Sequence, residues 1–311
     1  MSALRIGTRD SALALWQARR VADLIGAQPG SPAVELVHIK TEGDLRTDVP
    51  LSMVAGRAFF TKEIDRALLA NEIDIAVHSL KDLSTVLEPT IELAAVLERE
   101  DPRDALLTRG SCRSLTDLPR GARIGTSSLR RRAFLAHARP DLVALELRGN
   151  VPTRLEKLHR GDYDAIVLAT AGLNRLGLER HITEHLPPDK FPPAVSQGAI
   201  GICARSTDTN TLHWLQALDH DATRLATTAE RALLRRIEGG CQVPLGALAT
   251  LENGNLSLYA AVCTLDGSTI LTARAEGAVL LGERVAEQLL AQGAARIIAQ
   301  QRGIPPAAEL P

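Results

Sequence analysis

Three stretches of the chain share one pattern, in which an apolar run is followed by small polar residues and then by arginine. These stretches are Ile6–Ser11, Ile124–Arg132 and Leu147–Arg154. In an open α/β sheet, ligands bind beyond the carboxyl ends of the strands, where helix N-termini offer N–H groups and a positive dipole end. Arginine pairs with carboxylates through two parallel hydrogen bonds. The pattern therefore predicts a cleft that binds several anionic groups. The arginines expected to line it are Arg9, Arg130, Arg131, Arg148 and Arg154.

A candidate for acid–base or electrostatic chemistry lies at the end of another apolar run. The segment DIAVHSLKD, residues 74–82, reads as a buried strand that opens into a polar loop. A carboxylate at Asp82 can stabilise a cationic intermediate or handle protons. The alternative is a local salt bridge with Lys81, which the spacing alone favours. His78 is interpreted as a strand-end histidine with satisfied hydrogen bonds and not as a catalyst.

Cys241 differs from the other cysteines because it follows two glycines directly after a predicted helix. The glycines permit a tight turn and exposure, which a reactive or modified thiol needs. Cys112, Cys203 and Cys263 are expected to be small buried hydrophobes. No pair of cysteines has CxxC spacing, so a zinc site or disulfide framework is not expected. We expect the protein to reside in a reducing cytoplasm.

The elements that position these residues alternate between strand and helix through the first two-thirds of the chain, which indicates α/β architecture. Strands are expected at residues 4–8, 34–39, 73–78, 91–97, 105–108, 122–126, 142–147 and 165–169, and helices at 12–25, 61–70, 129–138 and 152–159. Beyond residue 220, an α+β unit is expected from helices at 222–237 and 283–300 and strands at 247–251, 256–262 and 270–275. The charged segment 98–103 and the proline-rich segment 186–193 read as connectors. No internal repeat is found.

Composition excludes several classes of protein. The 311 residues are 45% hydrophobic and 23% charged, as in globular proteins of two or three domains. No apolar run reaches the roughly 20 residues that span a bilayer, and the N-terminus lacks the apolar stretch of a secretory signal, so neither a membrane nor an exported protein is expected. The net charge of −1 and 3% aromatic content argue against a nucleic-acid partner, including an RNA-binding regulator that would use Arg130–Arg132.

Six segments in a fixed order resemble the porphobilinogen deaminase family, and the similarity runs almost from end to end. They are Ala76–Asp82, Arg99–Asp104, Gly125–Arg131, Leu147–Asn150, Ala171–Gly177 and Glu238–Pro244. The resemblance implies two α/β domains like those of periplasmic binding proteins and a smaller α+β domain. We expect these domains at residues 1–98 with 198–218, at 103–192 and at 221–311, the last carrying the cofactor.

The resemblance also implies an activity. The family's transferases join four porphobilinogen molecules head to tail, release ammonia at each addition, and finally hydrolyse the chain to linear hydroxymethylbilane for tetrapyrrole and haem biosynthesis. The growing chain is attached to a dipyrromethane cofactor, held by a thioether to the residue that is Cys241 here. The implied protein is a cytoplasmic monomer that needs no metal. Each pyrrole carries an acetate and a propionate, which gives the arginines their ligands.

The family's functional residues carry over by position. Asp82 is the catalytic carboxylate that stabilises the cation formed when ammonia leaves. The cofactor-binding residues are Cys241, Lys81, Asp82, Thr126, Ser127, Ser128, Arg130, Arg131, Arg148 and Asn150. The substrate-binding residues are Arg9, Ser11, Arg57, Arg148, Arg154 and Arg175. We expect Arg131 and Arg148 to pair with ligand carboxylates and not with protein groups.

The chain departs from the family pattern at a few positions. In the segment 51–60, which is usually a mobile loop over the active site, Met53 replaces a lysine, Arg57 a second lysine and Ala58 a glycine. Ser196 stands where glycine is common and Cys203 where glutamate is common. A carboxylate-binding protein of the same two-lobed fold is the alternative, and the third domain with Cys241 and the missing export signal argue against it.

Overall fold

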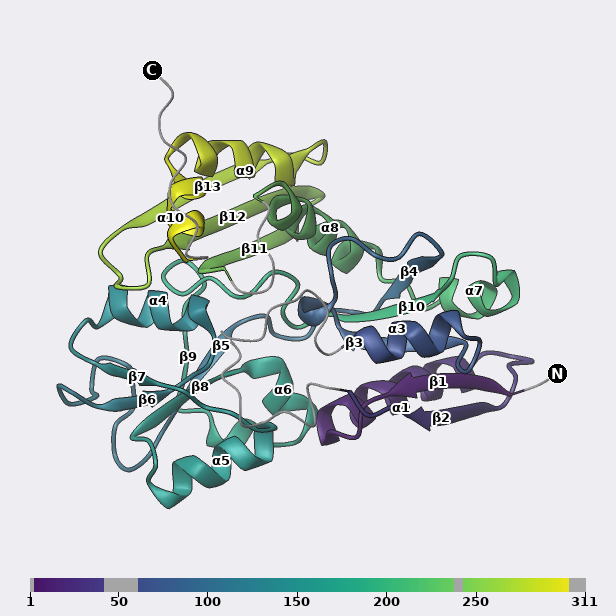
Figure 1. Ribbon diagram of the computed structural model, residues 1–311, viewed down its shortest axis with the longest axis horizontal. Coiled ribbons are helices and arrows are strands. Elements are labelled where there is room, and N and C mark those ends of the chain that lie inside the picture. Colours follow the sequence, from purple (N-terminus) through teal and green to yellow (C-terminus); the bar gives the residue numbers. More distant parts are fainter. Residues whose placement is uncertain (1–2, 42–60, 238–242, 302–311) are drawn as a thin grey trace.

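The computed structural model describes residues 3–41, 61–237 and 243–301, which form three β-sheets (Figure 1). The first sheet lies at the lower right of Figure 1, the second at the lower left, and the third above both. The predictions for Met53, Arg57, Ala58 and Cys241 lie outside the described residues. No helix within those residues is long and apolar enough to cross a membrane.

The first sheet has the strand order β2-β1-β3-β10-β4. Its strands are β1 (Leu4–Thr8), β2 (Val34–His38), β3 (Ile75–Ser79), β4 (Ile91–Val96) and β10 (Ile200–Arg205). β1 is parallel to β2 and β3, whereas β10 is antiparallel to both β3 and β4. Its helices are α1 (Ala12–Gly26), α3 (Lys62–Leu69) and α7 (Thr209–Gln216). Apolar residues of α1 pack with those of β1, β3 and β10 into one core, so the first sheet is covered on that face by α1.

The second sheet has the order β7-β6-β8-β5-β9. Its strands are β5 (Asp104–Thr108), β6 (Arg123–Gly125), β7 (Val143–Leu145), β8 (Ala165–Ala169) and β9 (Glu184–His185). Its helices are α4 (Leu129–Ala138), α5 (Val151–Arg160) and α6 (Thr170–Arg175). β6 is parallel to β7 and β8, and β5 is antiparallel to β8 and β9. This sheet therefore repeats the topology of the first, although no internal repeat is detectable in the sequence.

The fourth strand of each sheet, β10 in the first and β5 in the second, is antiparallel and follows a segment that crosses over from the other sheet. The chain leaves β4 through residues 97–103 to enter β5, and it returns through residues 186–199 to enter β10. The expected fold class of two α/β domains is thereby confirmed. The domain boundaries given above stay a prediction, which the placement of β10 in the first sheet supports.

The third sheet is the antiparallel meander β11 (Leu245–Glu252), β12 (Asn255–Cys263) and β13 (Ile270–Glu276). Its apolar side chains pack with α8 (Asp221–Arg236), α9 (Leu281–Ala291) and α10 (Ala294–Gln301), which confirms the smaller α+β unit. The prediction of one helix over 283–300 is wrong. The helix is interrupted at Gly293, whose φ of +100° is incompatible with a continuous helix.

A buried ion pair fastens both crossings to the third sheet. Arg99 on the first crossing donates from Nη1 to Glu230 Oε1 of α8 at 2.6 Å and from Nε to the Gln197 carbonyl on the second crossing at 2.8 Å. Glu230 is fully buried and also accepts the backbone N–H groups of Ser196, at 2.6 Å, and Ala249, at 2.8 Å. One carboxylate thus connects the two crossings, α8 and β11.

The second crossing needs unusual backbone conformations. Gly198 has φ +91°, and a Cβ there would lie 2.3 Å from the carbonyl oxygen of Glu100 on the first crossing. Only glycine allows the two crossings to approach this closely. Ser196, with φ +62°, is also left-handed, a conformation that glycine adopts at lower cost than serine. Its buried Oγ has no hydrogen-bond partner among the described residues.

Replacing Glu230 with alanine should lower the free energy of unfolding by about 3–5 kcal/mol, because Arg99 is left charged and buried beside two unpaired N–H groups. Glu287→Ala is the matched control, since Glu287 pairs with Arg236 at 2.6 Å where both side chains are at least half exposed. That change should cost less than about 1 kcal/mol. Equal midpoints for the two variants in urea unfolding would contradict the role given to Glu230.

Candidate functional site

The expected hydroxyl and amide residues lie where the strands of the two α/β sheets lead into helices. Ser11 caps α1, Ser128 caps α4 and Asn150 caps α5, each accepting a backbone N–H of the first helical turn. Ser127 Oγ donates to the Leu147 carbonyl at 2.6 Å and so joins two of the arginine-bearing stretches, while Thr126 is buried. These side chains fix the backbone from which the arginines extend.

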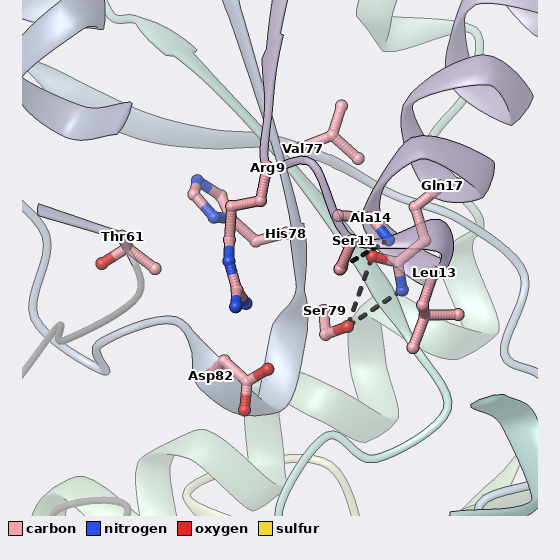
Figure 2. A pocket seen from close by; sticks show the side chains of 10 residues that line it. All are labelled: Arg9, Ser11, Leu13, Ala14, Gln17, Thr61, Val77, His78, Ser79 and Asp82. Atoms are coloured by element: carbon pink, nitrogen blue, oxygen red, sulfur yellow. Dashed lines mark hydrogen bonds between the residues drawn. The ribbon is translucent and has the colours of Figure 1, made fainter. Parts of the chain in front are cut away.

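A pocket of about 90 Å³ opens beyond the carboxyl ends of β1 and β3 (Figure 2). Its polar lining is Arg9, Ser11, Gln17, Thr61, His78, Ser79 and Asp82. Gln17 of α1 donates to Ser79 Oγ at 2.9 Å, which holds one wall. Figure 2 shows the Arg9 side chain extending toward Asp82. The pocket thus brings together three of the predicted residues, Arg9, Ser11 and Asp82.

His78 lies at the back of this pocket as an uncharged group. Its Nε2 is buried with no hydrogen-bond partner among the described residues and is 4.0 Å from Asp65 Oδ1. Burial, with the nearby charge of Arg9, lowers the pKa of His78 to about 4. The interpretation of His78 as a histidine with satisfied hydrogen bonds is therefore wrong for Nε2. Near neutral pH this side chain adds no positive charge to the pocket.

Arg130 and Arg131 surround a buried carboxylate that the sequence reasoning missed. Asp104 is fully buried, with Oδ2 at 2.7 Å from Arg130 Nη2 and Oδ1 at 2.7 Å from Arg131 Nη2. The Arg130 and Arg131 guanidinium groups also donate to the carbonyls of Pro192 and Val167. These cations hold the pKa of Asp104 far below its usual range against the opposing effect of burial.

The expectation that Arg131 pairs with no protein group is wrong. A signal for Asp104 was present, because it is an acidic residue that opens an apolar run within the Arg99–Asp104 motif. A carboxylate in a buried strand needs a cationic partner, and α4 supplies two.

Lys81 approaches the same cluster from the first sheet. Its ammonium donates to Gln197 Oε1 at 3.1 Å. Burial lowers the pKa of Lys81 to about 8, opposed chiefly by the neighbouring charge of Asp82. The charges of Arg130, Arg131 and Asp104 also act on Lys81, so residues from both α/β sheets meet here.

Arg154 and Arg175, both predicted to bind substrate, lie in different parts of the structure. Arg154 donates to the Gly149 carbonyl at 2.7 Å, and its pKa falls to about 10 through burial and through the charges of Arg131 and Arg148. Arg148 and Arg154 therefore belong with the positive cluster. Arg175 instead donates to the Gly198 carbonyl at 2.6 Å, with its guanidinium 5.7 Å from the centre of the Trp16 ring. It braces α6 against α1 and the second crossing.

The described residues contain no group of three or more side chains that could hold a metal ion. Cys203 and Cys263 are buried as expected, and burial raises the pKa of the Cys203 thiol to about 12. Cys112 is only partly buried. None of these three cysteines lines the pocket.

Arg131→Leu should lower the free energy of unfolding by about 3–5 kcal/mol, because it strips Asp104 of a buried partner. Arg123→Leu is the control, since the Arg123–Asp164 pair is exposed and should contribute less than about 1 kcal/mol. Denaturant unfolding of both variants tests this. An Arg131→Leu protein as stable as the control would show that Asp104 does not depend on Arg131.

The chain matches two family models and is similar to solved structures only weakly. The porphobilinogen deaminase, dipyromethane cofactor binding domain family matches residues 4–213, and the porphobilinogen deaminase, C-terminal domain family matches residues 224–291. Among solved structures, the VFT2 domain of Bordetella pertussis BvgS is 14% identical, with 71% of this chain and 90% of that chain covered and a TM-score of 0.43. The methionine binding protein MetQ is 13% identical, with 74% and 93% covered and a TM-score of 0.45. Structural similarities this weak add nothing to the assignment, whereas the two family matches cover most of the sequence. The chain belongs to the porphobilinogen deaminase family.

Proposed function

We propose that the pocket beyond β1 and β3 and the positive cluster around Asp104 form one active site for the reaction of this family. The chain is a transferase of tetrapyrrole biosynthesis that condenses porphobilinogen into linear hydroxymethylbilane and carries a dipyrromethane cofactor. The observation that supports the assignment of residues is that Asp82 lines the pocket, while the adjacent Lys81 donates to Gln197, which in turn donates to Asp104. The two places are thus joined by consecutive residues.

The charges of the cluster fit a cofactor that bears carboxylates. The charge of Arg131 acts on both Lys81 and Arg154, and that of Arg148 acts on Arg154. The carboxylates of Asp82, Asp104 and Glu146 offset only part of this positive charge. The buried Nε of Arg130 has no hydrogen-bond partner among the described residues. We expect these cations to hold the dipyrromethane, with Thr126, Ser127, Ser128 and Asn150 shaping the backbone around it. When bound, the cofactor supplies the free pyrrole carbon that accepts the first substrate ring.

Asp82 is assigned to the positive charge that develops on the pyrrole nitrogen of porphobilinogen as ammonia leaves. A carboxylate facing this N–H favours the cationic ring over the neutral pyrrole ring of the substrate. Arg9 extends toward Asp82 and is assigned, with Ser11, to a carboxylate of the substrate (Figure 2). Because His78 is neutral near pH 7, it does not repel the substrate's ammonium group.

The remaining assignments are also proposals. We assign Arg57 to a ligand carboxylate and Cys241 to the thioether, both outside the described residues. We assign Arg175 to a substrate carboxylate, a role that requires its contact with the Gly198 carbonyl to open on binding. We also propose that the protein is a cytoplasmic monomer that needs no metal and binds no nucleic acid. A plain carboxylate-binding protein is the alternative, and it would bind porphobilinogen without forming product.

Asp82→Asn should lower kcat by roughly 100- to 1,000-fold, because an amide still accepts a hydrogen bond but does not offset a cation. Porphobilinogen binding and the unfolding midpoint should change little. Product formation is followed by absorbance after cyclisation and oxidation of hydroxymethylbilane. Asp141→Asn, away from the pocket, is the control and should leave the rate unchanged. An Asp82→Asn enzyme with more than a tenth of the wild-type rate would remove Asp82 from the mechanism.

The intact mass of the purified protein tests the attachment site. We expect the wild type to exceed its sequence mass by two condensed pyrrole units and Cys241→Ser to lack this excess. Cys112→Ser, which changes a thiol outside the pocket, should retain it. An active wild-type protein without the added mass would contradict the covalent cofactor.

A further inference from the structure

Gln197 occupies the point where the two crossings and the two α/β sheets meet. It lies on the second crossing and is 1% exposed. Its Oε1 accepts a hydrogen bond from Lys81 Nζ at 3.1 Å, and its Nε2 donates to Asp104 Oδ1 at 2.9 Å and to the Pro102 carbonyl at 2.8 Å. A single side chain therefore contacts the loop after β3, the first residue of β5 and the first crossing.

The chemistry of these partners admits one orientation of the amide. Lys81 has only donors, whereas the Asp104 carboxylate and the Pro102 carbonyl have only acceptors, so the amide oxygen must face Lys81 and the nitrogen must face the other two. In this orientation each of the three contacts of the amide pairs a donor with an acceptor. The opposite orientation would set the amide N–H groups against the ammonium and the amide oxygen against two oxygen atoms.

An uncharged side chain is suited to this position because it separates two opposite charges. A carboxylate here would neutralise Lys81 and repel Asp104, and an apolar side chain would remove one acceptor from Lys81 and one donor from Asp104. The amide instead leaves Asp104 to Arg130 and Arg131 and keeps the positive charge of Lys81 in the site.

We propose that Gln197 is a positioning residue of the active site, which orients the Lys81 ammonium toward ligand carboxylates and links it to the arginine cluster at Asp104. This inference rests on the proposed role of Lys81. The charged groups that act on Lys81 are Asp82, Asp104, Arg130 and Arg131.

The protonation of Lys81 provides a measurable pH dependence that a purely structural role of Gln197 would not shift. With a pKa of about 8, Lys81 loses its charge as the pH rises through that value, so kcat/KM should fall on the alkaline side. A negative charge at position 197 favours the ammonium and should move this fall to higher pH. Loss of the acceptor disfavours the ammonium and should move the fall to lower pH.

The experiment compares pH profiles of kcat/KM for the wild-type holoenzyme and for Gln197→Glu, Gln197→Met and Lys81→Arg, each checked for cofactor by intact mass. We expect opposite shifts for Gln197→Glu and Gln197→Met, and a roughly 10- to 100-fold lower kcat/KM for Gln197→Met, as for the loss of a hydrogen bond to a charged group. Lys81→Arg should abolish the fall near pH 8, because arginine stays protonated. Gln28→Glu is the matched control, since Gln28 donates to the Trp214 carbonyl outside the pocket and should keep the wild-type profile.

The inference is overturned if Gln197→Met loses stability and activity while its alkaline fall stays at the wild-type pH, or if the fall persists in Lys81→Arg. If Gln197→Glu does not fold, the shift in Gln197→Met alone decides. A wild-type protein that forms no hydroxymethylbilane would instead refute the proposed function, so the two failures are distinguishable.

Discussion

The arrangement of the site depends on one buried carboxylate, Asp104. Two arginines on consecutive positions of a helix repel each other and are costly to bury. Asp104 offsets one of their charges and accepts hydrogen bonds from Arg131 and Gln197, so Arg130 and Arg131 stay buried on α4 in fixed orientations. The remaining positive charge faces Lys81 across the junction of the two sheets. We therefore expect ligand carboxylates to bind to cations that the protein has already fixed in place.

The repeated topology explains why the site lies at this junction. Both α/β sheets direct the carboxyl ends of parallel strands, and the helices that follow them, toward ligand-binding loops. The exchanged strands β5 and β10 force the chain to cross twice between the sheets, and both crossings meet at Glu230, Gln197 and Gly198. A change in the angle between the sheets would therefore displace Gln197, which contacts both Lys81 and Asp104. The fold links the relative position of the sheets to the electrostatics of the site.

Much of this could be predicted from the sequence, because the informative signals are local. Strands 4–8 and 165–169 and helix 129–138 have the expected bounds, and Ser11, Ser128 and Asn150 begin their helices as polar caps. The prediction missed β10, because its apolar run does not show which strand it pairs with. Its partner, β3, lies more than a hundred residues earlier in the sequence. The prediction also missed Asp104, because no local pattern shows that the carboxylate opening this strand is buried between two arginines of α4. Nor does a local pattern tell whether Arg175 meets a ligand or a carbonyl such as that of Gly198. Long-range pairing of charges decides these cases.

The same burial that creates the site explains why arginine, and not lysine, supplies most of its charge. Burial lowers the pKa of Arg154 to about 10, and Arg154 still remains protonated near pH 7. It lowers the pKa of Lys81 to about 8, where a modest further loss of hydration would remove the charge. Lysines at the Arg130, Arg131 and Arg154 positions would lower one another's pKa within this buried cluster. Some of them would then be uncharged near neutral pH. Arginine therefore suits these buried positions better than lysine, and the single lysine of the cluster is tolerated beside Asp82 and the amide of Gln197.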